Sequence, residues 1–141
     1  MYIVNQFEEC KKMVDKIRRK RELIAEINDK LYSPKNQIVS DMPRGGATEN
    51  IIDKYLEKKQ CEEEAIKELQ KQLTEKWNGI ETRLKEKGTN QENIILMYER
   101  FICSKSWQSC VDYMKERYPS GNWNANKAFR TYRSNLYKLN K

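Results

Sequence analysis

A heptad pattern near the start of the chain constrains the possible folds more than any other feature. Apolar side chains recur there at alternating spacings of four and three residues, at Ile3, Phe7, Cys10, Val14, Ile17, Ile24 and Leu31. Arg21 and Asn28 occupy the two seam positions that are not apolar. A seam of this kind, flanked by Lys, Arg and Glu, is typical of a helix of about 30 residues that packs against another helix. The pattern therefore predicts a long coiled-coil helix.

A second long helix is expected after an interruption. Proline and glycine residues between 33 and 48 exclude regular helix in that stretch. Apolar side chains then resume at helical spacing, at Ile52, Tyr55, Leu56, Ile66, Leu69, Leu73, Trp77, Ile80 and Leu84. Lys59 and Glu62 leave the middle of this stripe polar. A connection of this length lets the second helix fold back antiparallel on the first. We therefore expect a helical hairpin over residues 1–87, with its turn at 33–48.

The rest of the chain, residues 89–141, predicts a small three-helix domain. Gly88 is a suitable stop for the long helix. Thr89 begins a capping-box pattern, and Ser106 is a candidate N-cap for the next helix. With 35% charged residues, five Gly and three Pro in the whole chain, the composition favours an all-α fold. The expected core of this domain consists of Phe101, Trp107, Val111, Met114, Phe129, Tyr132 and Leu136.

Positive charge is concentrated at the end of the chain. The net charge is +7, and residues 104–141 hold eight Lys and Arg against two Asp and Glu. This distribution is the electrostatic footprint expected for binding an anionic polymer. The last predicted helix, residues 122–139, carries an apolar stripe made of Ala125, Ala128, Phe129, Tyr132, Leu136 and Leu139. Its opposite side is basic and polar.

Basic and amide side chains on a helix with an apolar back are the groups needed to hold phosphates and read base edges. The candidate DNA-binding residues are Trp123, Asn126, Lys127, Arg130, Arg133, Ser134, Tyr137 and Lys138. Lys127, Arg130 and Lys138 are expected to contact phosphates. Asn126 and Ser134 are candidates for base edges, and Trp123 or Tyr137 for packing on the sugar-phosphate backbone. The alternative is an ordinary solvated basic face on a terminal helix.

Several classes of function are disfavoured by what the sequence lacks. The chain has no histidine and no CxxC pair among its four cysteines, which excludes a zinc finger. Cys103 and Cys110 are expected to be buried in the C-terminal core. No nucleophile–base pair or phosphate-binding glycine loop is recognisable, so we expect neither an enzyme nor a cofactor. Without a signal peptide or a long apolar run, an intracellular protein with reduced thiols and no membrane association is expected.

Two motifs resemble a known family. One is Val39-Ser40-Asp41-Met42-Pro43-Arg44-Gly45-Gly46, followed by Ile51-Ile52-Asp53-Lys54-Tyr55; the other is Tyr98-Glu99-Arg100-Phe101 with Lys105-Ser106-Trp107. The chain is thereby similar to the ArpU-type transcriptional regulators encoded by phages of Gram-positive bacteria. That resemblance implies an N-terminal coiled coil and a C-terminal helix-turn-helix domain like region 4 of sigma factors. It also implies regulation of phage genes by binding double-stranded DNA in the host cytoplasm.

The chain departs from that family at one place, and a second class of function stays open. Residues 115–122 make the connection inside the expected helix-turn-helix longer than the usual tight turn. The heptad seam predicts a homodimer, which would bridge two half-sites. Host RNA polymerase or another host protein is a further possible partner. The alternative function is a helical protein-binding inhibitor or adaptor that acts on a host nucleic-acid machine, of the anti-CRISPR type.

Overall fold

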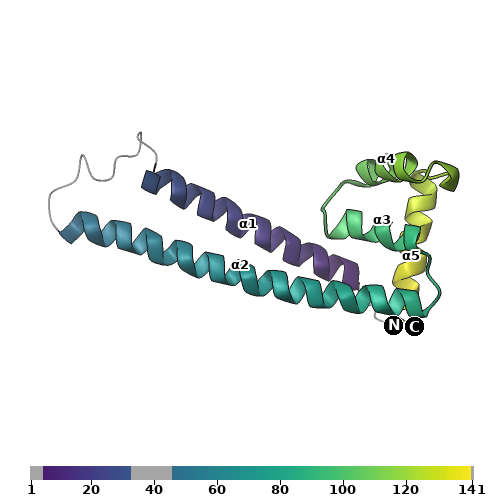
Figure 1. Cartoon of the computed structure of the whole chain (residues 1–141), viewed down its shortest axis with the longest axis horizontal. Coiled ribbons are helices and arrows are strands. Elements are labelled where there is room, and N and C mark those ends of the chain that lie inside the picture. Colours follow the sequence, from purple (N-terminus) through teal and green to yellow (C-terminus); the bar gives the residue numbers. More distant parts are fainter. Residues whose placement is uncertain (1–4, 33–45, 141) are drawn as a thin grey trace. The chain divides into compact units, whose positions relative to one another are not determined.

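The structure is a computed structural model that describes residues 5–32 and 46–140 (Figure 1). The described residues form helices and no strand, which confirms the all-α class. The helices are α1 (Gln6–Tyr32), α2 (Gly46–Glu86), α3 (Gln91–Phe101), α4 (Trp107–Arg117), the short 3-10 helix η2 (Pro119–Gly121) and α5 (Ala125–Leu139). Most of the predicted turn at 33–48, including Met42 to Gly45 of the glycine motif, lies outside the described residues.

The chain divides into two compact regions, and each is described by itself. The hairpin region is Asp15–Gln72, and the core region is Met1–Val14 together with Leu73–Lys141. The sequence predicts a division near residue 88. In the structure, both ends of the predicted hairpin instead belong to the same compact region as the C-terminal helices.

In the hairpin region, α1 lies antiparallel to α2 (Figure 1). Lys20 Nζ pairs with Glu62 Oε2 at 2.9 Å, while the Lys30 ammonium lies 5.6 Å from the centroid of the Tyr55 ring. From Lys20 to Lys30 along α1 the partner on α2 moves back from Glu62 to Tyr55, as an antiparallel arrangement requires. The polar middle of the α2 stripe therefore has a partner on α1.

The heptad pattern predicts the buried side of the hairpin only in part. Ile17 and Ile66 are buried as expected. Ile27 is also buried although it lies off the predicted seam, whereas Leu56, assigned to the buried stripe of α2, is 43% exposed. The seam position Arg21 is exposed. The seam predicted from spacing is therefore wrong in places, as at Ile27, which lies one residue before the predicted seam residue Asn28.

The core region surrounds one hydrophobic cluster with members from all five α-helices. Its buried members are Phe7, Cys10, Trp77, Ile80, Leu84, Ile94, Leu96, Met97, Phe101, Cys110, Val111, Met114, Trp123, Ala128 and Leu139. Phe101 lies at the centre of its aromatic part, with ring centroids 5.2 Å from Phe7, 5.4 Å from Tyr132 and 6.1 Å from Trp107. The first turns of α1 and the end of α2 thus share a core with α3, α4 and α5.

The helix boundaries in the core region follow from three local signals. Gly88 ends the long helix with a positive φ of 81°, a conformation that favours glycine. The N-cap of α3 is Asn90, whose side chain accepts a hydrogen bond from the Asn93 backbone N–H at 3.0 Å. The capping-box assignment to Thr89 is therefore wrong by one residue. Ser106 caps α4 as predicted, accepting from the Ser109 N–H at 3.1 Å.

The four cysteines fall into two groups. Cys10 and Cys110 are fully buried, and burial raises the pKa of each thiol to about 11. Cys61 and Cys103 are exposed. The prediction that Cys110 is a core residue is confirmed, and the same prediction for Cys103 is wrong. Cys103 lies after the end of α3, in the turn before Ser104, which has a φ of 57°.

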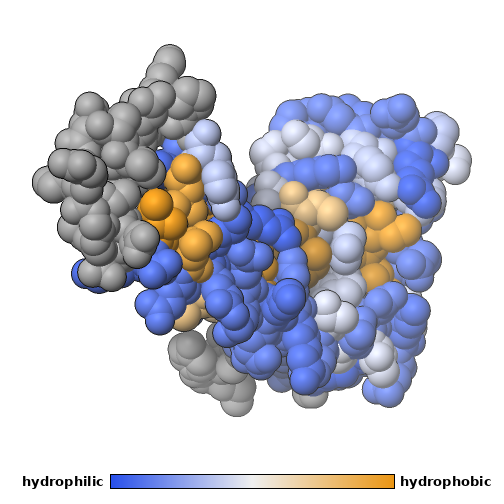
Figure 2. All heavy atoms as spheres, turned by 60° about the vertical axis from the view of Figure 1, so that its left-hand side comes forward, coloured by the Kyte–Doolittle hydropathy of each residue, from blue (hydrophilic) through white to orange (hydrophobic). Residues whose placement is uncertain are grey.

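Hydrophilic residues cover most of the face seen in Figure 2, where hydrophobic residues appear in small separate groups. Within the two described stretches of the chain, no helix is long and apolar enough to cross a lipid bilayer.

Candidate nucleic-acid interface

An ordered connection leads into α5. Pro119–Gly121 forms η2, and Asn122 follows in the left-handed region with a φ of 55°. Trp123 then enters the core, where its indole Nε1 donates to Glu92 Oε2 at 3.3 Å. A Cβ on Gly121 would lie 2.7 Å from that indole nitrogen, so the close approach requires glycine. The connection that departs from the expected tight turn is thus a packed 3-10 turn.

Helix α5 begins after Asn124, whose side chain accepts from the Lys127 backbone N–H at 2.8 Å. Its inner face buries Ala128, Thr131, Asn135 and Leu139. Tyr132 is half-buried and packs against Phe101. The inner face therefore includes two polar residues that hydrophobic spacing does not identify.

The apolar stripe predicted for this helix is partly wrong. Phe129 is 52% exposed, and Ala125 is exposed as well. Because Thr131 and Asn135 take inward positions, the buried side is rotated away from Phe129. An apolar residue consequently lies on the outer, basic side of the helix.

That outer side, which we call the α5 stripe, consists of Asn126, Phe129, Arg130, Arg133, Ser134 and Tyr137, all of them exposed. The whole of α5 contains no Asp or Glu. Arg130 and Arg133 make no ion pair or hydrogen bond with any residue that the structure describes. Their guanidinium groups, on adjacent turns of one helix face, are therefore available to a ligand.

The other predicted site residues are occupied within the protein. Trp123 is 3% exposed and belongs to the core, so its assignment to a DNA-stacking role is corrected. Lys127 donates through Nζ to the carbonyl oxygen of Gly121 and lies 4.3 Å from the centroid of the Trp123 ring. Lys138 donates to the Thr89 hydroxyl at 3.1 Å. The predicted set thus separates into an outward group and a group that stabilises the fold.

Phe129 is the residue on this surface that reasoning from sequence assigned to the wrong side. No signal in the sequence distinguishes it from a core residue, because it satisfies the same helical spacing as Tyr132. Only the burial of Thr131 and Asn135 reveals the rotation.

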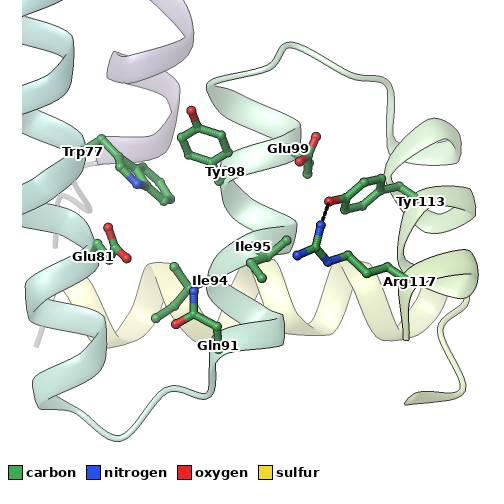
Figure 3. Close-up of a pocket in the computed structure, with 9 residues that line it drawn as sticks. All are labelled: Trp77, Glu81, Gln91, Ile94, Ile95, Tyr98, Glu99, Tyr113 and Arg117. Atoms are coloured by element: carbon green, nitrogen blue, oxygen red, sulfur yellow. Dashed lines mark hydrogen bonds between the residues drawn. The ribbon is translucent and has the colours of Figure 1, made fainter. Parts of the chain in front are cut away.

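A groove of about 260 Å³ lies elsewhere in the core region (Figure 3). Trp77 and Glu81 of α2 line one side, residues of α3 form its floor, and Tyr113 and Arg117 of α4 line the other side. Arg117 donates to the Tyr113 hydroxyl at 2.7 Å, and Glu99 pairs with Lys105 at 2.6 Å. The Trp77 and Tyr98 rings meet edge to face with centroids 5.4 Å apart. Three of its nine lining residues are aromatic, and of its polar side chains Glu81, Glu99 and Arg117 already have partners.

Within residues 5–32 and 46–140, no cluster of three or more His, Cys, Asp or Glu is placed to hold a metal ion. Comparison of the chain with protein-family models, with curated proteins and with solved structures finds no match.

Proposed function

We propose that this protein binds double-stranded DNA through the α5 stripe and regulates transcription of phage genes without catalysing a reaction. The resemblance to ArpU-type regulators suggests the biological setting, a phage-infected bacterial cytoplasm. In this proposal α4 and α5 act as a helix-turn-helix, with α5 entering the major groove. Arg130 and Arg133 contact DNA, and Asn126 and Ser134 face base edges.

One observation supports the proposal most directly. Arg130 and Arg133 have no partner among the described residues, and no carboxylate on α5 competes for them. Like charges this close on a helix face repel one another weakly. Phosphate and guanine are the common partners of guanidinium groups in protein–DNA complexes. The remaining lysines of α5 already stabilise the fold.

The test is a double substitution, Arg130→Gln with Arg133→Gln. The parent protein and the variant are titrated against random-sequence duplexes over a series of salt concentrations. Binding should weaken for every sequence, and the log–log salt slope should flatten by about 0.9 for each phosphate contact removed. Circular dichroism should show an intact fold, because exposed substitutions change stability by within about 0.5 kcal/mol.

A matched control separates a specific site from general charge. Lys67→Gln with Lys71→Gln also removes two positive charges, but from the exposed side of α2. This control should bind DNA as the parent does. If the two double variants bind equally well with equal salt slopes, the DNA-binding role of α5 is rejected.

We further propose that the protein acts as a homodimer through seam positions of α1 that its own fold leaves partly accessible, such as Val14 and Ile24. Two copies would place two α5 helices on two half-sites. Light scattering at tens of micromolar should give twice the 17.0 kDa chain mass. A monomer mass at that concentration would contradict dimerisation without affecting the proposal for α5.

A protein-binding inhibitor or adaptor, acting on a host nucleic-acid machine, is the second candidate function. The observation that favours it is the groove of Figure 3, where the exposed Tyr98 ring would receive a partner's side chain. The salt series distinguishes the two functions. Failure of the parent protein to bind any duplex at low salt would make this candidate the preferred one.

A further inference from the structure

Phe129 lies in the middle of the α5 stripe with half of its surface exposed. It is flanked on the same helix face by Asn126, Arg130 and Arg133, at spacings of three, one and four residues. A single exposed apolar residue is ordinary on a protein surface. Phe129, however, lies between the groups proposed to contact DNA, and this position favours a contact between its ring and the DNA.

The Phe129 ring packs against another aromatic side chain on one side. Phe129 meets Tyr132 edge to face, with centroids 6.3 Å apart. Tyr132 is in turn held by a hydrogen bond from Asn5 Nδ2 to its hydroxyl at 2.7 Å, and by packing against Phe7 and Phe101. One side of Phe129 is therefore anchored on the aromatic cluster, and the other side faces outward.

Building on the proposed function, we propose that Phe129 recognises thymine by contacting its 5-methyl group in the major groove of duplex DNA. That methyl is the one apolar group that the base pairs present in the major groove, and phenylalanine is among the side chains that contact it. Asparagine and arginine recognise adenine and guanine edges in the same groove. The stripe thus combines an apolar contact with polar contacts to neighbouring bases.

The spacing along the helix fits such a reading. Asn126 and Arg133 are separated by about 10 Å along the axis at 1.5 Å per residue. Successive bases on one strand are about 3.4 Å apart, so this distance corresponds to roughly three base steps. Phe129 would contact a base between those facing Asn126 and Arg133.

An unpaired base stacked on Phe129 is the competing arrangement, since aromatic rings on basic surfaces also bind single strands. The second exposed ring of the helix, Tyr137, lies eight residues away, or about 12 Å. With the two exposed rings this far apart and the guanidinium pair between them, the narrow helix face favours the groove of a duplex. Tighter binding of a single strand than of a duplex would contradict the contact with thymine.

The experiment replaces thymine by uracil, which removes only the methyl group. Duplexes bound by the full-length protein are selected from a random library, and each thymine of the selected site is then replaced singly by deoxyuridine. Replacement at one position should weaken binding by roughly three- to fivefold, the effect of one buried methyl. Phe129→Ala should weaken binding to the thymine duplex and abolish the difference between thymine and uracil.

Tyr137→Ala is the matched control, because it removes the other exposed ring of the same helix. Whatever its overall affinity, it should keep the preference for thymine over uracil. Equal binding of the parent protein to thymine and uracil duplexes would overturn the inference, as would tighter binding to the single-stranded oligonucleotide than to the duplex. If Arg130→Gln with Arg133→Gln still reduces duplex binding in that case, the proposed function stands and only the role of Phe129 fails. Selection of no duplex at all rejects both.

Discussion

The hairpin region and the core region differ in how much apolar surface they bury. Among the described residues, the hairpin region has three buried hydrophobic side chains, Ile17, Ile27 and Ile66. The core region has fifteen, including phenylalanine and tryptophan rings. Because buried apolar area is the main favourable term in folding, stability should be concentrated in the core region.

The contrast also shows what a heptad pattern does and does not determine. It ensures that two helices have matching faces. Where the seam holds polar residues such as Asn28, whose Oδ1 is buried without a hydrogen-bond partner among the described residues, it contributes little packing. Extended helices can thus coexist with a stability that resides mainly elsewhere.

The largest expected effect is that of Phe101→Ala, which removes the centre of the aromatic cluster. Phe101 is 1% exposed, and the truncation should cost about 3–5 kcal/mol of unfolding free energy. Ile66→Ala in the hairpin region should cost less, near the lower end of about 2–5 kcal/mol. Urea denaturation measures both losses, and Phe129→Ala serves as an exposed control with little change. Equal losses for Phe101→Ala and Ile66→Ala would break the contrast between the regions.

The rates of thiol labelling should also distinguish the two regions. Cys61 of the hairpin region should react at least a hundredfold faster than Cys10 and Cys110 of the core region, a ratio equivalent to about 2.7 kcal/mol. Cys61 should react fastest with a thiol reagent at neutral pH. Cys103 should follow, because partial burial and the nearby Glu99 carboxylate raise its pKa. Cys10 and Cys110 should react slowest, since burial both shields them and raises the pKa of each to about 11. Rapid labelling of all four cysteines in the folded protein would contradict a tightly packed core region.

The same pKa values predict how the stability of the core region depends on pH. A thiol with a folded-state pKa above its ordinary value of 9.0 stabilises the fold fully below pH 9. That contribution is lost as the pH rises from about 9 toward 11. Denaturation midpoints of the parent and of Cys110→Ala, compared at pH 8 and pH 10.5, should converge at the higher pH.

Asn135→Leu should stabilise the core region by about 1–2 kcal/mol. Asn135 is 1% exposed, and neither its Oδ1 nor its Nδ2 has a hydrogen-bond partner among the described residues. Leucine has the same branching and the same number of side-chain heavy atoms, and it removes two unsatisfied buried groups. Thermal denaturation should show a higher midpoint. Asn126→Leu, on the exposed face, should leave the midpoint nearly unchanged, and a lower midpoint for Asn135→Leu would show that the amide is needed.

The smallest effect is expected in the hairpin region. Glu62→Gln removes the pair with Lys20, whose side chain is 28% exposed, and should cost less than about 1 kcal/mol. The loss should shrink further in 1 M salt. Glu63→Gln, an exposed neighbour, is the control. A cost above about 2 kcal/mol would show that the hairpin depends on polar contacts more strongly than its burial suggests.

The sequence predicts the helices of this protein better than it predicts their faces. Breakers such as Gly88 and caps such as Ser106 act locally, so their residues alone indicate where helices begin and end. The buried side of α5 could not be predicted, because Phe129 fits the apolar spacing while Thr131 and Asn135 are the residues that pack inward. Which side faces inward depends on the tertiary partners of the helix.

The candidate site was predictable to a similar extent. The excess of cations and the absence of acids on α5 are visible in the sequence. The sequence does not show which of those cations form hydrogen bonds within the protein. Lys127 reaches Gly121, and Lys138 reaches Thr89, only because the turns of the folded chain bring them together. Trp123 could not be assigned from sequence for the same reason, since its partner Glu92 lies 31 residues away.

The distribution of indole rings has a spectroscopic consequence. All three tryptophans, Trp77, Trp107 and Trp123, belong to the core region, and the hairpin region contains tyrosine as its fluorophore. Tryptophan fluorescence, excited at the red edge of the absorption band, will therefore report on the unfolding of the core region and will not detect unfolding of the hairpin region. Far-ultraviolet ellipticity, to which the long helices contribute strongly, weights the two regions differently. Emission and ellipticity curves that separate on heating would reveal two folding units rather than an experimental artefact.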